Sequence, residues 1–378
     1  MNKFLDINYL LVNASAKDIY NEIKELPFFD IHSHVDVNQL AENKNFEDIW
    51  QVEGQTDHYV WELMRRRGVE EKFITGKATN KEKWFKLASV FPDFVGNPLY
   101  EWIHLDLRRT LNINEEISAE TAEKFWNESK EILKEDALKP VNIIKNAHIK
   151  KMCIISDVLD SLENFKKINA PYKILPVFRA DKVYNIEKDE FIKFSNELCK
   201  KFNSNERTFD GYLDALGKAL LYFKEFGCQV SDQGLFIPYG HYVTTSRAKE
   251  IYVKRISNKA LNNEEVADYK AFMLFYLGEL YSKNNFTAQY HIGAVRDYRK
   301  SLFDMLGPDS GGDISTNSLE IAMNLKDFLN AFDGKFNIIL YVVDPFHLPT
   351  IATIARAYSN VLIGAPWWFN DSPFGIEF

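Results

Sequence analysis

The chain has 378 residues, of which 46% are apolar and 26% charged, as is typical of a globular protein with a large core. Its net charge of −8 argues against a nucleic-acid partner, and it contains no apolar run long enough to span a membrane and no signal peptide, since Asp6 interrupts the N-terminus. The three cysteines are too widely spaced for a disulfide framework or a metal knuckle, so we expect a cytoplasmic protein.

Seven short apolar runs, each with a polar or aromatic end, recur along the chain. They cover 27–34, 150–157, 172–179, 229–237, 286–293, 336–343 and 360–369. Helical periodicity separates several of them, most clearly in 209–226, where leucine and phenylalanine recur at spacings of three and four. Apolar strands that alternate with helices predict a parallel sheet covered on both faces. Seven or eight such units favour a (β/α)8 TIM barrel over a doubly wound sheet.

The spacing of the runs divides the chain into three parts. About 115 residues separate the first two strands, far more than a crossover helix needs. We therefore predict an N-terminal helix and first strand in 1–34, a helical insertion over one barrel face in 35–149, and strands two to seven in 150–378. The long gap 238–285 is predicted to contain one strong helix, 267–282.

The first run ends in two histidines, His32 and His34. Side chains at positions i and i+2 of a strand point to the same face, and the active site of a parallel barrel lies where its strands end. Imidazole is a preferred ligand of zinc-type ions, so the pair forms half of a candidate metal site. The alternative is two hydrogen-bonded surface histidines. His291 ends the fifth run, where a third ligand or a substrate-polarising imidazole would lie, and it favours the metal interpretation.

Two arginines, Arg179 and Arg296, also follow apolar runs. A guanidinium group can bind a carboxylate through two hydrogen bonds, which makes both arginines candidates for substrate binding. Either could instead form a structural ion pair with Asp157, Asp232 or Asp344.

Two further tracts have both a functional and a structural interpretation. His58 and Tyr59 could supply a proton-transfer group and a hydroxyl donor, or they could belong to a helix start capped by Asp57. Trp367 and Trp368 could form an aromatic wall of a sugar site, or they could pack in the core.

Together these tracts resemble the uronate isomerase (glucuronate isomerase) family of the amidohydrolase superfamily. The resemblance runs in order along nearly the whole chain. It rests on "DIHSHV" at 30–35, "DHYVWELMRRRGVEEKFITGK" at 57–77, "GNPLYEWIHLDLRR" at 96–109, "SDVLDSLENF" at 156–165, "FRADKVYNIE" at 178–187, "CQVSDQG" at 228–234, "YHIGAVR" at 290–296, "LGPDSGGD" at 306–313 and "PWWFND" at 366–371.

The resemblance implies an isomerase that interconverts a hexuronate aldose and its 2-ketose form. The pairs would be D-glucuronate and D-fructuronate or D-galacturonate and D-tagaturonate, with metal-assisted proton transfer between C1 and C2. It implies a distorted (β/α)8 barrel with a helical insertion, and a homo-oligomer that binds a small-molecule substrate. By this resemblance His32 and His34 would bind a divalent metal, zinc by preference. The catalytic residues would be His58, Tyr59 and His291, and the substrate-binding residues would be Arg179, Asp232, Arg296, Trp367 and Trp368.

The chain departs from the family pattern at two places. Gln233 stands where relatives usually have a histidine, and the chain stops at Phe378, before the family's eighth strand with its metal-binding aspartate. Seven strands cannot close an eight-stranded barrel. We therefore expect either a truncated chain that retains metal weakly and has little or no activity, or another segment in the eighth position. A metal-dependent hydrolase and a non-catalytic protein remain as alternatives.

Overall fold

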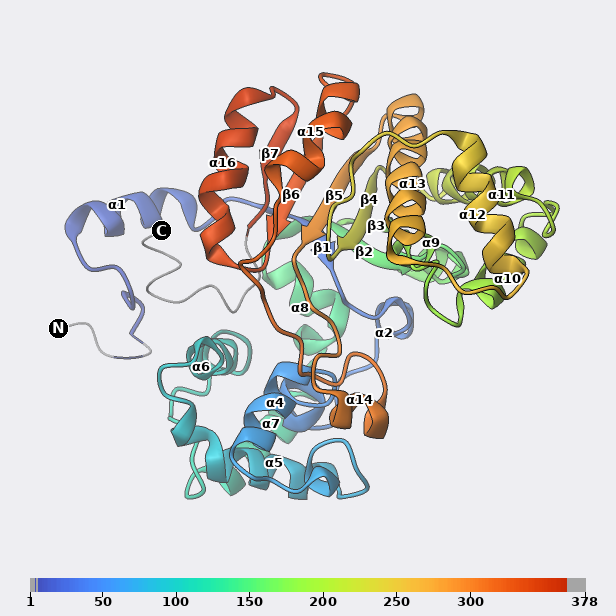
Figure 1. Ribbon diagram of the computed structural model, residues 1–378. Coiled ribbons are helices and arrows are strands. Elements are labelled where there is room, and N and C mark those ends of the chain that lie inside the picture. The colour runs from blue at the N-terminus through green and yellow to red at the C-terminus, as the bar shows by residue number, and fades with distance from the viewer. Residues whose placement is uncertain (1–3, 5, 366–378) are drawn as a thin grey trace.

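The computed structural model describes residue 4 and residues 6–365, so the predicted wall residues Trp367 and Trp368 lie outside the described part of the chain. Seven parallel strands form one sheet in sequence order. They are β1 (Phe28–Ser33), β2 (Ile149–Asp157), β3 (Lys173–Arg179), β4 (Val230–Leu235), β5 (Thr287–Ile292), β6 (Ile338–Val342) and β7 (Val361–Ile363). Each predicted run contains one of these strands, and the sheet curls into a half-barrel (Figure 1).

Helices follow the strands and cover the outer face of the sheet (Figure 1). They are α10 (Phe191–Lys201), α11 (Phe209–Glu225), α12 (Thr245–Ile256), α13 (Asn263–Asn284), α15 (Ala322–Ala331) and α16 (Leu348–Ala357). Two short helices, α9 (Asp181–Tyr184) and α14 (Lys300–Leu306), follow β3 and β5, and α14 lies away from that face (Figure 1). The helix predicted over 209–226 is confirmed as α11. The strong helix predicted over 267–282 is confirmed as part of α13, but a second helix between β4 and β5, α12, was not predicted. The sequence of α12, TSRAKEIYVKRI, has too many charged residues for a strong apolar pattern. Its N-terminus is instead capped by the side chain of Thr244.

Seven helices lie between β1 and β2. They are α2 (Val37–Glu42), α3 (Ile49–Glu53), α4 (His58–Arg66), α5 (Asn80–Val90), α6 (Pro98–Leu111), α7 (Ala122–Ile132) and α8 (Pro140–Asn146). Short 3-10 helices occur in this segment at Glu71–Phe73, Phe91–Phe94 and Asp136–Leu138, and later at Glu163–Lys167 and Pro345–His347. Helices α4 to α7 gather beside the half-barrel (Figure 1) around a separate core that includes Trp50, Trp84 and Phe125.

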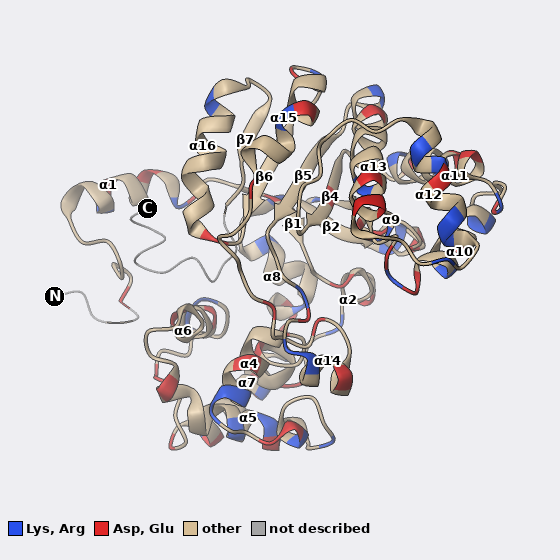
Figure 2. Cartoon of the chain, viewed as in Figure 1, with Lys and Arg blue, Asp and Glu red and all other residues tan. Residues whose placement is uncertain are grey.

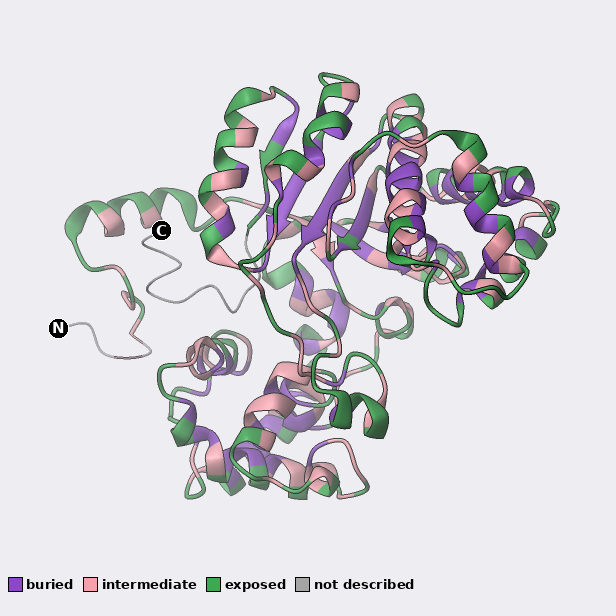
Figure 3. Cartoon of the chain, in the orientation of Figure 1, coloured by how far each residue is buried: buried purple, intermediate pink, exposed green. Residues whose placement is uncertain are grey.

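The main core lies between the sheet and its helices and includes Phe178, Tyr290 and Leu340, all fully buried. Figure 3 shows the inner strands buried, while Figure 2 shows that most charged residues lie on the helices and loops. The division into three parts stays a prediction, although the helices between β1 and β2 do have a core of their own. In the described part of the chain, no helix is long and apolar enough to cross a membrane.

The two edges of the sheet and the N-terminal helix expose apolar side chains. On β1, Phe28 and Phe29 are 62% and 64% exposed, and on β7, Leu362 and Ile363 are 48% and 46% exposed. Helix α1 (Ala14–Ile23) projects from the body and has no buried residue (Figure 3).

Candidate active site

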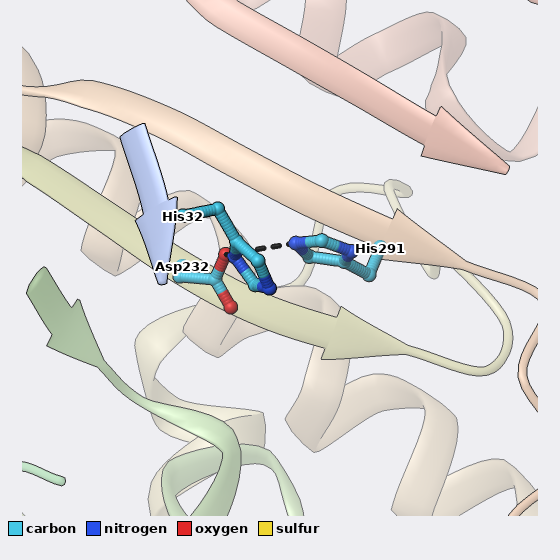
Figure 4. A group of neighbouring side chains, drawn as sticks. All are labelled: His32, Asp232 and His291. Atoms are coloured by element: carbon cyan, nitrogen blue, oxygen red, sulfur yellow. Dashed lines mark hydrogen bonds and ion pairs between the residues drawn. The ribbon is translucent and has the colours of Figure 1, made fainter. Parts of the chain in front are cut away.

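Three side chains from different strands meet inside the half-barrel near the strand ends. His32 of β1, Asp232 of β4 and His291 of β5 offer ligand atoms that all lie within 4.8 Å of one another (Figure 4). Oδ2 of Asp232 accepts hydrogen bonds of 2.8 Å from Nδ1 of His32 and from Nε2 of His291. A carboxylate shared by two imidazoles is a combination that could hold a divalent metal.

Asp232 is completely buried, between Ser231 and Gln233, which are also buried. Its second oxygen, Oδ1, accepts no hydrogen bond from the described residues, although Nη1 of Arg179 lies 3.2 Å away as an ion-pair partner. Burial raises the pKa of Asp232, but the opposing effects of His291 and His32 are larger and hold the pKa far below its ordinary value. The carboxylate is therefore charged, and the two imidazoles must donate to it.

The charged carboxylate fixes the tautomer of His32. When Nδ1 of a neutral His32 donates to Asp232, Nε2 carries the lone pair, and that atom lies 3.2 Å from Nε2 of His34. Two nitrogens bound to one tetrahedral zinc are about 3.3 Å apart, since each Zn–N bond is about 2.0–2.1 Å. The separation of the two nitrogens and the buried, incompletely bonded Asp232 thus fit a zinc-type ion.

Two residues that the sequence did not single out hold this arrangement together. Pairing of β1 with β2 shifts register between Asp30 and Ser33, and the Ile31 carbonyl oxygen instead accepts a 3.0 Å hydrogen bond from Nε2 of Gln289 on β5. Oε1 of Gln289 accepts a 2.5 Å hydrogen bond from the Tyr341 hydroxyl of β6. The Tyr341 ring stacks on the His291 ring, with 4.5 Å between centroids and 6° between planes.

Both candidate arginines are already paired with carboxylates. Arg179 donates to Asp181 at 2.8 Å and lies beside Asp232, so the ion pair considered as an alternative is present. Burial alone would lower the pKa of Arg179, but these two carboxylates raise it overall. Arg296 pairs at 2.6 Å with Asp313, a partner that the sequence did not indicate. A guanidinium has five N–H donors, so neither pairing excludes a substrate contact.

His58 and Tyr59 occupy the first turn of α4, in the helical layer outside the three-residue cluster, and their rings lie 4.1 Å apart. The capping role foreseen for Asp57 is confirmed, because its carboxylate accepts from the backbone amides of Tyr59 and Val60. Burial raises the pKa of Asp57, while these amide hydrogen bonds oppose the shift.

A parallel half-barrel with imidazoles and a buried carboxylate at its strand ends defines an α/β enzyme of the barrel class with a candidate metal centre. The family model for glucuronate isomerase matches residues 1–378. The curated uronate isomerase of Thermotoga maritima is 50% identical over 377 residues, which are 99% of this chain and 83% of that protein. The chain therefore belongs to the glucuronate isomerase family, within the amidohydrolase superfamily.

Solved structures agree with this assignment. A crystal structure of uronate isomerase from Thermotoga maritima superimposes with a TM-score of 0.96 at 50% identity, covering 100% of this chain and 84% of that one. Glucuronate isomerase from Caulobacter crescentus has the same fold, with a TM-score of 0.90 at 22% identity, covering 95% of this chain and 77% of that one. These findings support an isomerase and do not favour the hydrolase alternative.

Proposed function

We propose that this chain interconverts a hexuronate aldose and its 2-ketose form by metal-assisted proton transfer between C1 and C2. D-Glucuronate and D-galacturonate are the proposed aldoses. The observation that carries the proposal is the cluster of His32, Asp232 and His291 with His34 beside it, in a chain of this family.

His32 and His34 would hold the metal through their Nε2 atoms, and Asp232 would accept the hydrogen bond from Nδ1 of His32. Zinc is the proposed ion because imidazole is one of its preferred ligands, and a carboxylate that accepts from a ligating imidazole commonly supports such a site. When bound, such an ion would supply Lewis-acid stabilisation of the negative charge that develops on substrate oxygens during proton transfer.

Asp232 orients His32 and His291 through the hydrogen bonds that its buried carboxylate accepts from them. As a charged acceptor it holds His32 in the Nδ1–H form, which orients Nε2 toward the metal position. It also accepts from Nε2 of His291, so that Nδ1 of His291 carries the lone pair and can accept a proton. The Tyr341 ring stacked on His291 fixes the plane of that imidazole.

The remaining site residues are assigned to substrate binding and proton transfer. Arg179 and Arg296 bind the substrate carboxylate and hydroxyl oxygens through their guanidinium groups. His58 and Tyr59 assist proton transfer along the C1–C2 end. Trp367 or Trp368 forms a wall of the site.

We also propose that the sheet is part of a distorted (β/α)8 barrel and that the helices between β1 and β2 are an insertion over one barrel face. A further strand between β1 and β7 would complete such a barrel and cover the apolar side chains exposed on those two strands. A cytoplasmic homo-oligomer without nucleic-acid or membrane partners is the proposed state.

The proposal is tested by incubating the purified chain with Zn²⁺ and D-glucuronate and measuring the 2-ketose. His34→Ala should lose the activity, whereas His241→Ala should keep it, because the side chain of His241 is half exposed and pairs with Asp268 of α13. Hydrolysis of amides, lactones or esters in a substrate panel, without ketose formation, would overturn the proposal in favour of the hydrolase.

A further inference from the structure

Residues 307–313, in the loop that follows β5 and α14, are docked against one face of α4. The backbone N–H of Gly312 donates to Oε1 of Glu62, and Nη1 of Arg65 donates to the carbonyl oxygen of Ser310. Arg65 is itself held by Glu71, which accepts two hydrogen bonds of 2.8 Å from its guanidinium. Figure 1 shows α14 and this loop near α4, although 245 residues separate Arg65 from Ser310 in sequence.

The face of α4 that makes these contacts is the face that carries His58. Residues at i, i+4 and i+7 lie above one another on a helix, so His58, Glu62 and Arg65 form one row. Val60 and Met64 lie on a different face and are fully buried in the helical core. The docked segment therefore fixes the helix from the side opposite its own core.

The backbone of the segment is suited to this close approach. Gly311 and Gly312 have φ angles of +94° and +97°, a conformation that favours glycine. A Cβ atom at Gly311 would lie 2.5 Å from Cγ of Glu62, so any larger residue would push the Glu62 side chain away.

The same segment reaches both candidate substrate-binding arginines. Asp313 pairs with Arg296 at 2.6 Å, and its other oxygen accepts from the Asp297 amide at 2.9 Å. Val295 and Ile314, which flank these residues, are joined by two backbone hydrogen bonds in an antiparallel bridge. Asp309 lies near enough to Arg179 to contribute to the raised pKa of that guanidinium.

We propose that Glu62 and Arg65 are positioning residues that clamp segment 307–313 and thereby hold the His58 face of α4 in a fixed orientation to Arg179 and Arg296. The inference rests on the proposed function for its catalytic meaning, but the clamp itself is a structural claim. Loss of the clamp should lower the rate of proton transfer more than substrate binding, because it displaces His58 and Tyr59, whereas the pairs of Arg179 with Asp181 and Asp232 lie outside the segment.

Hydrogen exchange measured by mass spectrometry tests the clamp directly. Glu62→Ala should speed exchange at 310–313 about tenfold or more, because the Gly312 amide loses a charged acceptor. Glu62→Gln should restore most of the protection, since its amide oxygen can still accept. Arg67→Ala is the matched control, because Arg67 ends the same helix and pairs with the surface residue Asp93. Gly311→Ala should also speed exchange at 310–313, because its Cβ would displace the Glu62 side chain. It is the second variant to use if Glu62→Ala folds poorly.

Kinetics with D-glucuronate then test the positioning role. Glu62→Ala should lower kcat about tenfold with a smaller change in KM, and Glu62→Gln should recover it. Unchanged exchange in both Glu62→Ala and Gly311→Ala would overturn the clamp, and faster exchange with parental kcat and KM would overturn the positioning role. If the parent chain forms no ketose, the proposed function fails separately, and exchange at 310–313 and in the first turn of α4 still decides the clamp.

Discussion

Replacing Tyr341 with phenylalanine isolates one hydrogen bond inside the half-barrel. The substitution keeps the ring that stacks on His291 but removes the hydroxyl that donates to Gln289. Tyr341 is 7% exposed and Gln289 is completely buried, so water cannot replace the lost donor. A buried acceptor left without a partner costs about 1–3 kcal/mol, which is the expected loss in the free energy of unfolding.

Gln289→Leu should cost about twice as much, because it leaves both the Tyr341 hydroxyl and the Ile31 carbonyl without their Gln289 partner. The double variant removes both members of the Tyr341–Gln289 bond. Its cost should therefore be smaller than the sum of the single costs by about 1–2 kcal/mol.

Urea denaturation followed by circular dichroism measures these three differences, and Zn²⁺ titration adds a second readout. Gln289→Leu should weaken zinc binding about tenfold or more, because Ile31 precedes His32, while Tyr341→Phe should stay close to the parent. Strictly additive stability costs, or equal zinc affinity in the parent and Gln289→Leu, would refute the argument that this chain of hydrogen bonds positions β1.

Three further predictions follow from individual groups. His34→Ala should lower bound zinc per chain after dialysis, measured by atomic emission, and a parental zinc content would contradict the ligand assignment. Burial, then Asp106 and Asp57, raise the pKa of the buried Glu53 well above 4.5, so the folded chain binds that proton more tightly than the unfolded chain. The free energy of unfolding then falls as the pH rises past about 4.5. Compared with the parent, Glu53→Gln should therefore be stabilised more at about pH 8 than at about pH 4. An equal stabilisation at both pH values would contradict the raised pKa. Burial also raises the thiol pKa values of Cys153, Cys199 and Cys228, to about 11 for Cys199 and about 12 for Cys228. Because all three thiols are buried, a thiol reagent should label them only after denaturation. Rapid labelling of the native chain would show that they are accessible.

Local patterns predicted the sheet well because most strands contain a short run of apolar residues that is followed by polar ones. All seven runs contain strands, and the polar residues at their ends include His32, Asp232 and His291. The alternation of residues on β5 also offered a signal for Gln289, which lies two positions before His291 and so faces the same side. A lone glutamine in an apolar run, however, is equally compatible with a packing role, and only the tertiary contact to Ile31 distinguishes the two.

Contacts between distant segments were beyond the reach of the sequence. The docking of Gly312 on Glu62 joins residues 250 positions apart, and nothing in either local pattern indicates the other. The partner of Arg296 is Asp313, which belongs to a loop rather than to a strand end. Helix α12 was missed because the charged residues along it mask its short apolar face.

The most direct test of the account is proton NMR of D-glucuronate incubated in D₂O with the zinc-loaded chain. Transfer of a proton between C1 and C2 predicts the appearance of the 2-ketose and deuterium at C2 of the recovered aldose, because a proton held on a side chain exchanges with solvent. Both signals should disappear in His32→Ala and persist in His241→Ala. An aldose spectrum identical to that of the His32→Ala sample, with neither ketose nor deuterium incorporation, would contradict the proposed isomerase.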